Sequence, residues 1–200
     1  VIEDTGVDAI KIGMLHSAEL VTKVQETLAS YPIRDIVLDP VMVATSGDTL
    51  LKEDAIENLK KQLLPCVRVI TPNIPEAEVL LGEKIEDQED LPHFAKKLAK
   101  EYTVSVLLKA GHLTQNELID VFYNYETQET LRLPSQRLYT PNTHGTGCTL
   151  SSALAAFLAR GFSLNDAVIQ AKKYISEALS AGAEYRIGKG HGPVHHFYNF

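Results

Sequence analysis

The sequence predicts an α/β fold, a three-layer sandwich in which helices cover both faces of a mainly parallel sheet. Short apolar runs alternate with helical stretches through most of the 200 residues, which is the pattern of repeated strand–helix units. Some of these runs are apolar at every position, as strands buried on both faces are. No repeat or linker interrupts the alternation, so residues 1–200 are predicted to form a single domain.

The predicted strands are rich in β-branched and apolar residues and end in glycine, proline or polar residues. A short polar turn separates the last two, which therefore read as an antiparallel hairpin, whereas the others alternate with helices and are expected to pair in parallel. Their ranges are 8–15, 36–38, 67–70, 104–108, 118–125 and 130–133.

The predicted helices carry recognisable start and stop residues. Ser17 caps the first helix, which runs to about residue 30 and repeats Leu20, Val24 and Leu28 on one face. Pro65 is expected to stop the second helix. The remaining ranges are about 53–64, 75–82, 88–101, 148–160 and 163–181.

The composition excludes several classes of function. The chain has 19 Lys and Arg against 26 Asp and Glu, a formal net charge of −7, and no basic block. Nucleic acid and anionic membranes are therefore not expected as partners, because binding them needs concentrated positive charge. Cys66 and Cys148 are the only cysteines and lack a metal-type spacing, which favours a reducing, cytoplasmic location. The longest strongly apolar stretch, 148–159, is too short to cross a bilayer.

A glycine-containing loop, Gly145-Thr146-Gly147-Cys148, leads directly into a helix. The first backbone N–H groups of a helix are open, and with the positive end of the helix dipole they form an anion site. The two glycines let these amides approach a ligand closely, and Cys148 would hold or accept a proton there. The alternative is a tight turn into a buried helix, with Cys148 as a small hydrophobe. The spacing is not that of a Walker A loop.

Polar residues follow the predicted strands, at the carboxyl ends where open α/β sheets place their active sites. Asp39 and Glu76 follow neighbouring strands and together could hold Mg²⁺, although a lone carboxylate is as often a loop cap. Lys109 ends an apolar strand, where it either contacts a phosphate or extends to solvent. Met14 and Asn73 also stand at strand ends, and the loop Pro40–Thr49 is read as mobile or ligand-facing.

The glycine- and histidine-rich tail, Gly188–His196, invites a metal-site interpretation. No cysteine or carboxylate stands at a defined spacing from these histidines, so the favoured expectation is a glycine-rich connection that packs on the sheet edge.

Six segments, in this order along the chain, resemble hydroxymethylpyrimidine/phosphomethylpyrimidine kinase of thiamine biosynthesis, a ribokinase-like enzyme. Together they are highly specific, and the resemblance runs from end to end. They are Lys11–Leu15, Leu38–Gly47, Thr71–Ala77, Leu107–His112, His144–Cys148 and Gly190–Pro193.

The resemblance implies a phosphotransferase that uses ATP and Mg²⁺ to phosphorylate the hydroxymethyl group of the pyrimidine, and then the monophosphate that results. It implies a small-molecule substrate, a cytoplasmic location and a homodimer. The residues it assigns to the site fall into five groups. They are Gly145, Thr146 and Gly147 as the anion hole for the transferred phosphoryl group; Cys148 as the base; Asp39 and Glu76 at Mg²⁺; Asn73, Lys109 and Thr143 at ATP; and Met14 and Val41 at the pyrimidine.

The sequence itself and the resemblance each raise an expectation about the start of the chain. Residues 1–6 read as the last turn of a helix that ends at Gly6, so the chain is expected to begin inside a domain. The family's N-terminal glycine-rich strand and loop, which closes over the pyrimidine, is absent from these residues. The 200 residues alone are therefore expected to fold badly or to turn over poorly.

Two alternatives remain open at this point. A pyridoxal kinase of the same fold also phosphorylates a hydroxymethyl group on a heteroaromatic ring. A non-catalytic ligand sensor on the same fold would have no need of the set Asp39, Glu76, Lys109 and Cys148, which argues against it.

Overall fold

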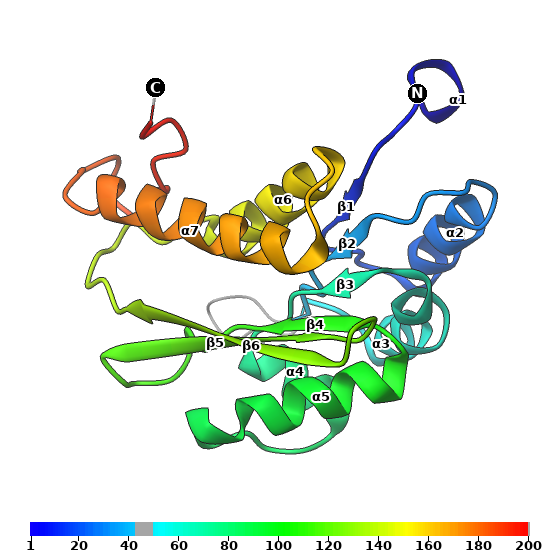
Figure 1. Cartoon of the computed structure of the whole chain (residues 1–200), viewed down its shortest axis with the longest axis horizontal. Helices are drawn as coiled ribbons and strands as arrows, with labels where there is room; N and C mark the ends of the chain where they lie inside the picture. Colours follow the sequence, from blue (N-terminus) through cyan, green and yellow to red (C-terminus); the bar gives the residue numbers. More distant parts are fainter. Residues whose placement is uncertain (43–49, 200) are drawn as a thin grey trace.

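Four parallel strands and an antiparallel hairpin form one sheet in this computed structural model, which describes residues 1–42 and 50–199 (Figure 1). Among these residues the strand order is β1-β2-β3-β4-β5-β6, and only the pairs β4–β5 and β5–β6 are antiparallel. The predicted α/β class with a mainly parallel sheet is confirmed. The strands are β1 (Ile10–Ile12), β2 (Ile36–Leu38), β3 (Val69–Ile70), β4 (Ser105–Leu108), β5 (Glu117–Asn124) and β6 (Glu129–Gln136).

The helices follow the strands along the chain largely as predicted. Most of the loop Pro40–Thr49, which we expected to be mobile or to face a ligand, lies outside the described residues. The helices are α1 (Ile2–Thr5), α2 (Ala18–Leu28), α3 (Glu53–Asn58), α4 (Ile74–Leu81), α5 (Leu91–Tyr102), α6 (Thr146–Ala159) and α7 (Leu164–Gly182), with a π-helical turn at Leu59–Leu63 and 3₁₀ turns at Leu64–Cys66 and Gln88–Asp90.

Helices cover both faces of the sheet, so the molecule has three layers. In Figure 1, α6 and α7 lie on one side of the sheet and α4 and α5 on the other. Successive strand residues alternate between the two cores: Leu38 packs with the helices α2 to α5, and Val37 packs with α6 and α7. Both side chains are fully buried. Strands that are apolar at every position therefore have the two-sided burial that the sequence predicted.

The helix ends confirm several capping predictions and correct one. The Ser17 hydroxyl accepts a hydrogen bond from the Leu20 amide at 3.3 Å, and Gly6 follows α1 with a φ of 76°. We expected Pro65 to stop the second helix, but the helical stretch runs on to Cys66. The chain passes from α3 through the π-helical turn into a 3₁₀ turn that contains Pro65, because a proline is tolerated in the first positions of a helical turn.

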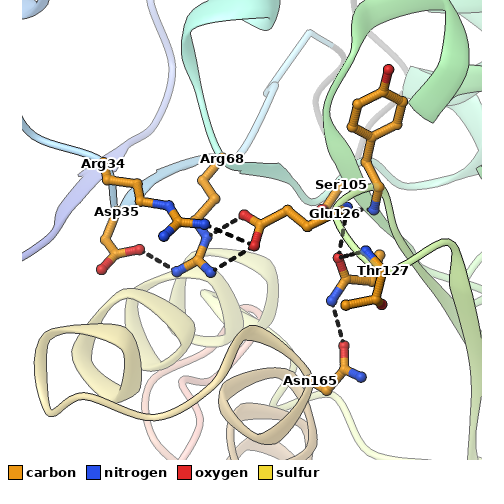
Figure 2. A network of polar contacts seen from close by, with 9 residues as sticks. Arg34, Asp35, Arg68, Ser105, Glu126, Thr127 and Asn165 are labelled. Carbon is orange, nitrogen blue, oxygen red and sulfur yellow. Dashed lines mark hydrogen bonds and ion pairs between the residues drawn. The ribbon is translucent and has the colours of Figure 1, made fainter.

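A charged network at the amino ends of β2 and β3 attaches the hairpin to the parallel strands (Figure 2). Arg68 donates through Nε and Nη2 to the two carboxylate oxygens of Glu126 at 2.8 and 3.1 Å, and it also pairs with Asp35. Arg34 donates to Glu126 at 2.9 Å. The Arg68 guanidinium holds the pKa of the Glu126 carboxyl below its usual range. Two arginines balance two carboxylates, so the network leaves no net charge for a ligand.

None of the helices within residues 1–42 and 50–199 is long and apolar enough to cross a membrane.

Candidate active site

Helix α6 begins with an open turn at the carboxyl end of the sheet. Gly145 is its N-cap and has a φ of 83°, a left-handed conformation that glycine adopts readily. The Thr149 amide donates to the Gly145 carbonyl at 2.8 Å. Within the described ranges the amides of Gly147 and Cys148 find no acceptor, so they are available to an anion. The helix starts at Thr146, two residues earlier than predicted, which puts the exposed Cys148 thiol at its third position.

A buried carboxylate, Asp39, stands directly after β2 with three partners. Its Oδ1 accepts hydrogen bonds from Lys109 Nζ at 3.1 Å and from the Thr71 hydroxyl at 3.0 Å. The Ser151 hydroxyl lies 3.4 Å from its Oδ2. The Asp39 side chain is only 3% exposed and that of Lys109 15%, so the ion pair is largely removed from water. Because little water screens the pair, the Coulomb attraction between its two charges is stronger than it would be at the surface.

Gly147 brings this ion pair against the first turn of α6. A β-carbon at Gly147 would lie 3.4 Å from Lys109 Nζ and 3.8 Å from Asp39 Oδ2. Because glycine has no side chain, the ammonium group and the carboxylate reach the backbone of the helix where its amides are open. The structure thus joins three elements that the sequence only suggested were neighbours.

Asn73 and Glu76 form a reciprocal cap at the start of α4. The Glu76 amide donates to Asn73 Oδ1 at 2.9 Å, and the Asn73 amide donates to Glu76 Oε2 at 2.8 Å. A parallel bridge between Asn73 and Lys109 places this cap beside the cluster. Burial raises the pKa of the Glu76 carboxyl to about 7, although the Lys109 charge opposes the rise, and the nearby Asp39 carboxylate adds to it.

The donor set suits both an anion and a hard cation. Lys109 and the amides of α6 provide positive charge, whereas the buried carboxylates of Asp39 and Glu76 are oxygen ligands of the kind Mg²⁺ prefers. Among the described residues, no group of three or more His, Cys, Asp or Glu could hold a metal. Two carboxylates completed by phosphate oxygens and water are the usual arrangement for Mg²⁺, so these residues fit the ion.

The side chains of the remaining residues assigned by the resemblance make no hydrogen bond to the side chains of the cluster among the described residues. The Val41 amide donates to the Asp39 carbonyl at 2.8 Å, and Val41 is half-buried. Met14 follows β1, with 51% of its surface exposed. Thr143 is exposed, and its carbonyl accepts from the Thr146 hydroxyl at 2.7 Å.

Sequence reasoning missed the two hydroxyl partners of Asp39. Thr71 directly follows β3, just before the Pro-Asn step, and a polar residue after a strand was a usable signal. Ser151 lies four residues after Gly147, so helical periodicity places both on one face of α6. Neither signal identifies the carboxylate that the hydroxyl contacts.

We expected the histidine-rich tail to pack on the sheet edge. Its backbone is instead attached to α7 and to the loop before α6. The His195 amide donates to the Ala178 carbonyl of α7 at 3.1 Å, and the Gly192 carbonyl accepts from the His144 amide at 3.0 Å. Packing against α7 and the loop before α6 thus satisfies these backbone groups.

Comparisons with known proteins agree with this geometry. The family described as Phosphomethylpyrimidine kinase matches residues 1–195. A hydroxymethylpyrimidine/phosphomethylpyrimidine kinase of Rhizobium meliloti is 44% identical over 201 residues, which are 100% of this chain and 74% of the relative.

Solved structures confirm the ribokinase-like fold that the resemblance implied. Phosphomethylpyrimidine kinase (thiD) from Clostridium difficile 630 matches with a TM-score of 0.76 and 37% identity, over 90% of this chain and 72% of that one. The pyridoxal kinase from Staphylococcus aureus, in complex with AMP-PCP and pyridoxal, matches with a TM-score of 0.84 and 33% identity, over 96% of this chain and 68% of that one. The chain belongs to the phosphomethylpyrimidine kinase family, a family of phosphotransferases.

Proposed function

We propose that the chain transfers a phosphoryl group from ATP to 4-amino-5-hydroxymethyl-2-methylpyrimidine, and then to its monophosphate, in thiamine biosynthesis. One observation carries the chemistry: Lys109 and Asp39 lie against Gly147, beside amides that have no acceptor among residues 1–42 and 50–199. The choice of acceptor is supported by the 44% identical relative, whose name states both pyrimidine substrates. The binding of ATP is supported by the AMP-PCP complex of a structural neighbour.

The anion hole is assigned to Gly145, Thr146 and Gly147, with the amide of Cys148. Phosphoryl transfer is catalysed mostly by positioning and by stabilising the charge on the transferred group. Open amides at a helix N-terminus do this without reorganising during the reaction, and the Lys109 ammonium group adds a full positive charge beside them. Asn73 and Thr143 are assigned to ATP.

The carboxylates of Asp39 and Glu76 are assigned to Mg²⁺, which would neutralise charge on the phosphates when bound. Without the ion, Asp39 is neutralised by Lys109 and Glu76 is held partly protonated at neutral pH by burial.

The Cys148 thiol is assigned to proton removal from the acceptor hydroxyl. It is exposed at the third position of α6, and so accessible to a substrate that lies over the open turn. General-base catalysis contributes typically 10²- to 10⁴-fold, so Cys148→Ala should lower kcat by at least about 100-fold. Cys66→Ala is the matched control, since Cys66 is also a free, exposed thiol but precedes β3 at the far end of the sheet. An unchanged kcat in Cys148→Ala would refute the base assignment.

A second candidate is phosphorylation of pyridoxal. The likeness to the Staphylococcus aureus pyridoxal kinase, at a TM-score of 0.84, favours testing it. We expect kcat/KM to be higher for the hydroxymethylpyrimidine than for pyridoxal when both are measured on the whole protein. The reverse order would make pyridoxal the substrate, and ATP consumption that depends on neither compound would favour a sensor.

We also propose a homodimer and a cytoplasmic location. The resemblance supports the dimer, which sedimentation of the purified protein would test. The requirement for ATP supports the cytoplasm, and fractionation of cells would test it.

A further inference from the structure

The tail segment 190–196 lies against the loop that leads into α6. The Gly192 carbonyl accepts a hydrogen bond from the His144 amide at 3.0 Å, and His144 and Pro193 form a parallel bridge. This attachment comes immediately before Gly145, the N-cap of the open turn. The tail therefore fixes the backbone on the entry side of the anion hole.

A second attachment lies on the other side of the same turn. His196 Nε2 is 3.0 Å from the Thr149 hydroxyl, and the Tyr174 hydroxyl donates to the His196 carbonyl at 2.9 Å. Thr149 is 9% exposed, and its amide closes the first turn of α6. Tail contacts thus bracket residues 145–148 from both ends.

The buried side chain of Asn142 contacts the tail and the end of α7, and so connects both to the loop before α6. Asn142 is 3% exposed and donates through Nδ2 to the carbonyls of Gly182 at 2.7 Å and of Tyr185 at 2.6 Å. Gly192 packs on the opposite side of this amide. A β-carbon at Gly192 would lie 1.9 Å from Asn142 Oδ1, so no other residue fits without moving Asn142.

We propose that Gly192, Asn142 and His196 are positioning residues for the anion hole, and that the Gly-His-Gly-Pro segment exists to hold it. None of the three joins the polar contacts of the Asp39–Lys109 cluster. They act through the backbone of residues 143–149, whose amides must stay aimed at one point to stabilise charge. The inference rests on the proposed function for its kinetic effect, but not for its effect on the loop.

The chain offers a matched pair of substitutions for the test. Gly190 is exposed, and a β-carbon there would meet nothing within 4 Å, so Gly190→Ala should behave as wild type. Gly192→Ala should displace Asn142 and lower kcat by about 10- to 100-fold, the cost of misplacing a catalytic group by roughly 1 Å. KM for the pyrimidine should change less than about twofold, because the acceptor pocket is not moved. Equal kcat values for the two variants would overturn the proposal.

A double substitution distinguishes positioning from general damage. In Asn142→Ala the amide that meets a new β-carbon at residue 192 is removed, and the next atom, Asn142 Cβ, is 3.5 Å away, which is ordinary contact. Both single variants disrupt the same contact between Asn142 and Gly192. Adding Gly192→Ala to Asn142→Ala should therefore lower kcat little further. Losses that multiply would mean that the two residues act independently, against the proposal.

Hydrogen exchange of the His144 amide separates this inference from the proposed function. Its protection should fall at least about tenfold in Gly192→Ala and stay unchanged in Gly190→Ala. If the wild type proves inactive on the pyrimidine, the proposed function fails while the exchange result still decides the positioning role. Equal protection in the two variants would overturn the positioning role whatever the activity.

Discussion

Glu76 and Asp39 are two carboxylates in one small buried region with one ammonium group between them. Lys109 makes its ion pair with Asp39, so burial dominates the ionisation of Glu76 and raises the pKa of its carboxyl to about 7. A charged group held in this way is unfavourable in the metal-free protein and becomes favourable when a cation arrives. This agrees with the proposed role of Glu76 in binding a cation.

Glu76→Gln should remove a pH dependence of stability. The folded-state pKa is raised from 4.5 to about 7, so the native state holds more protons in this window. The stabilising contribution is then fully present below about pH 4.5 and is lost as the pH rises to about 7. Its size is up to about 3 kcal/mol. Glutamine stays neutral and also suits the capping box.

Urea denaturation of the metal-free protein at several pH values measures this difference. Between pH 5 and 7, the slope of the unfolding free energy against pH should be more negative in the wild type than in Glu76→Gln. Equal slopes would mean that the carboxyl ionises normally in the folded chain.

The sequence predicted that Asp39, Glu76 and Lys109 stand at strand ends, but not how they meet. Asp39, Glu76 and Lys109 were found because each stands at a strand end. Their mutual distances depend on the register of β2, β3 and β4, which comes from packing of two cores and not from any local pattern. The hydroxyls of Thr71 and Ser151 were missed for the same reason.

The elements around the site are tied by a second buried ion pair. Lys172 of α7 donates to Asp120 Oδ2 at 2.6 Å, and Asp120 Oδ1 accepts from the Ala110 amide at 2.8 Å. Ala110 follows Lys109, so this pair connects β5 and α7 to the segment that carries the ammonium group. The Asp120 side chain is only 7% exposed, which makes the loss of its partner costly.

Lys172→Met should destabilise the protein by about 3 kcal/mol, because it leaves a buried carboxylate without its cation. Lys173→Met, at the exposed neighbouring position, should change stability by less than about 0.5 kcal/mol. Thermal or urea unfolding of the two variants provides the comparison. If Lys172→Met were as stable as Lys173→Met, the ion pair would contribute nothing to holding α7.

Element positions were predicted well where capping residues or strand composition mark them, as at Ser17 and at 36–38. They were wrong where tertiary contacts override the local signal. The 3₁₀ turn that contains Pro65 runs one residue past the proline, to Cys66, and Leu63 and Leu64 beside it are fully buried. The tail is held by contacts such as that of Gly192 with Asn142, which lies 50 residues away in sequence and which no pattern reveals.

The arginine network and the charged residues of the candidate site lie at opposite ends of the parallel strands. The arginine network of Figure 2 precedes β2 and β3, whereas Asp39 and Glu76 follow them. The network is electrically balanced and holds the hairpin, and the opposite end holds the open amides.

Arg68→Met should therefore lower stability without altering catalysis. It removes both hydrogen bonds to Glu126 and the ion pair with Asp35, at a cost of roughly 1–3 kcal/mol. Arg34→Met is the control, because the Arg34 side chain is 71% exposed and an exposed pair contributes at most about 1 kcal/mol. The KM for ATP should stay the same in both variants. A changed KM in Arg68→Met would mean that the two ends are coupled.

The central claim is that Lys109, held by Asp39 against Gly147, stabilises a phosphoryl group in transfer. The most direct measurement is ADP formation by the whole protein with ATP, Mg²⁺ and the hydroxymethylpyrimidine, in the wild type and in Lys109→Met. We predict pyrimidine-dependent ADP formation in the wild type and a kcat at least about 100-fold lower in the variant. A wild-type kcat in Lys109→Met would contradict the role of Lys109 in phosphoryl transfer. ADP formation by the wild type that does not depend on the pyrimidine would contradict the proposed substrate.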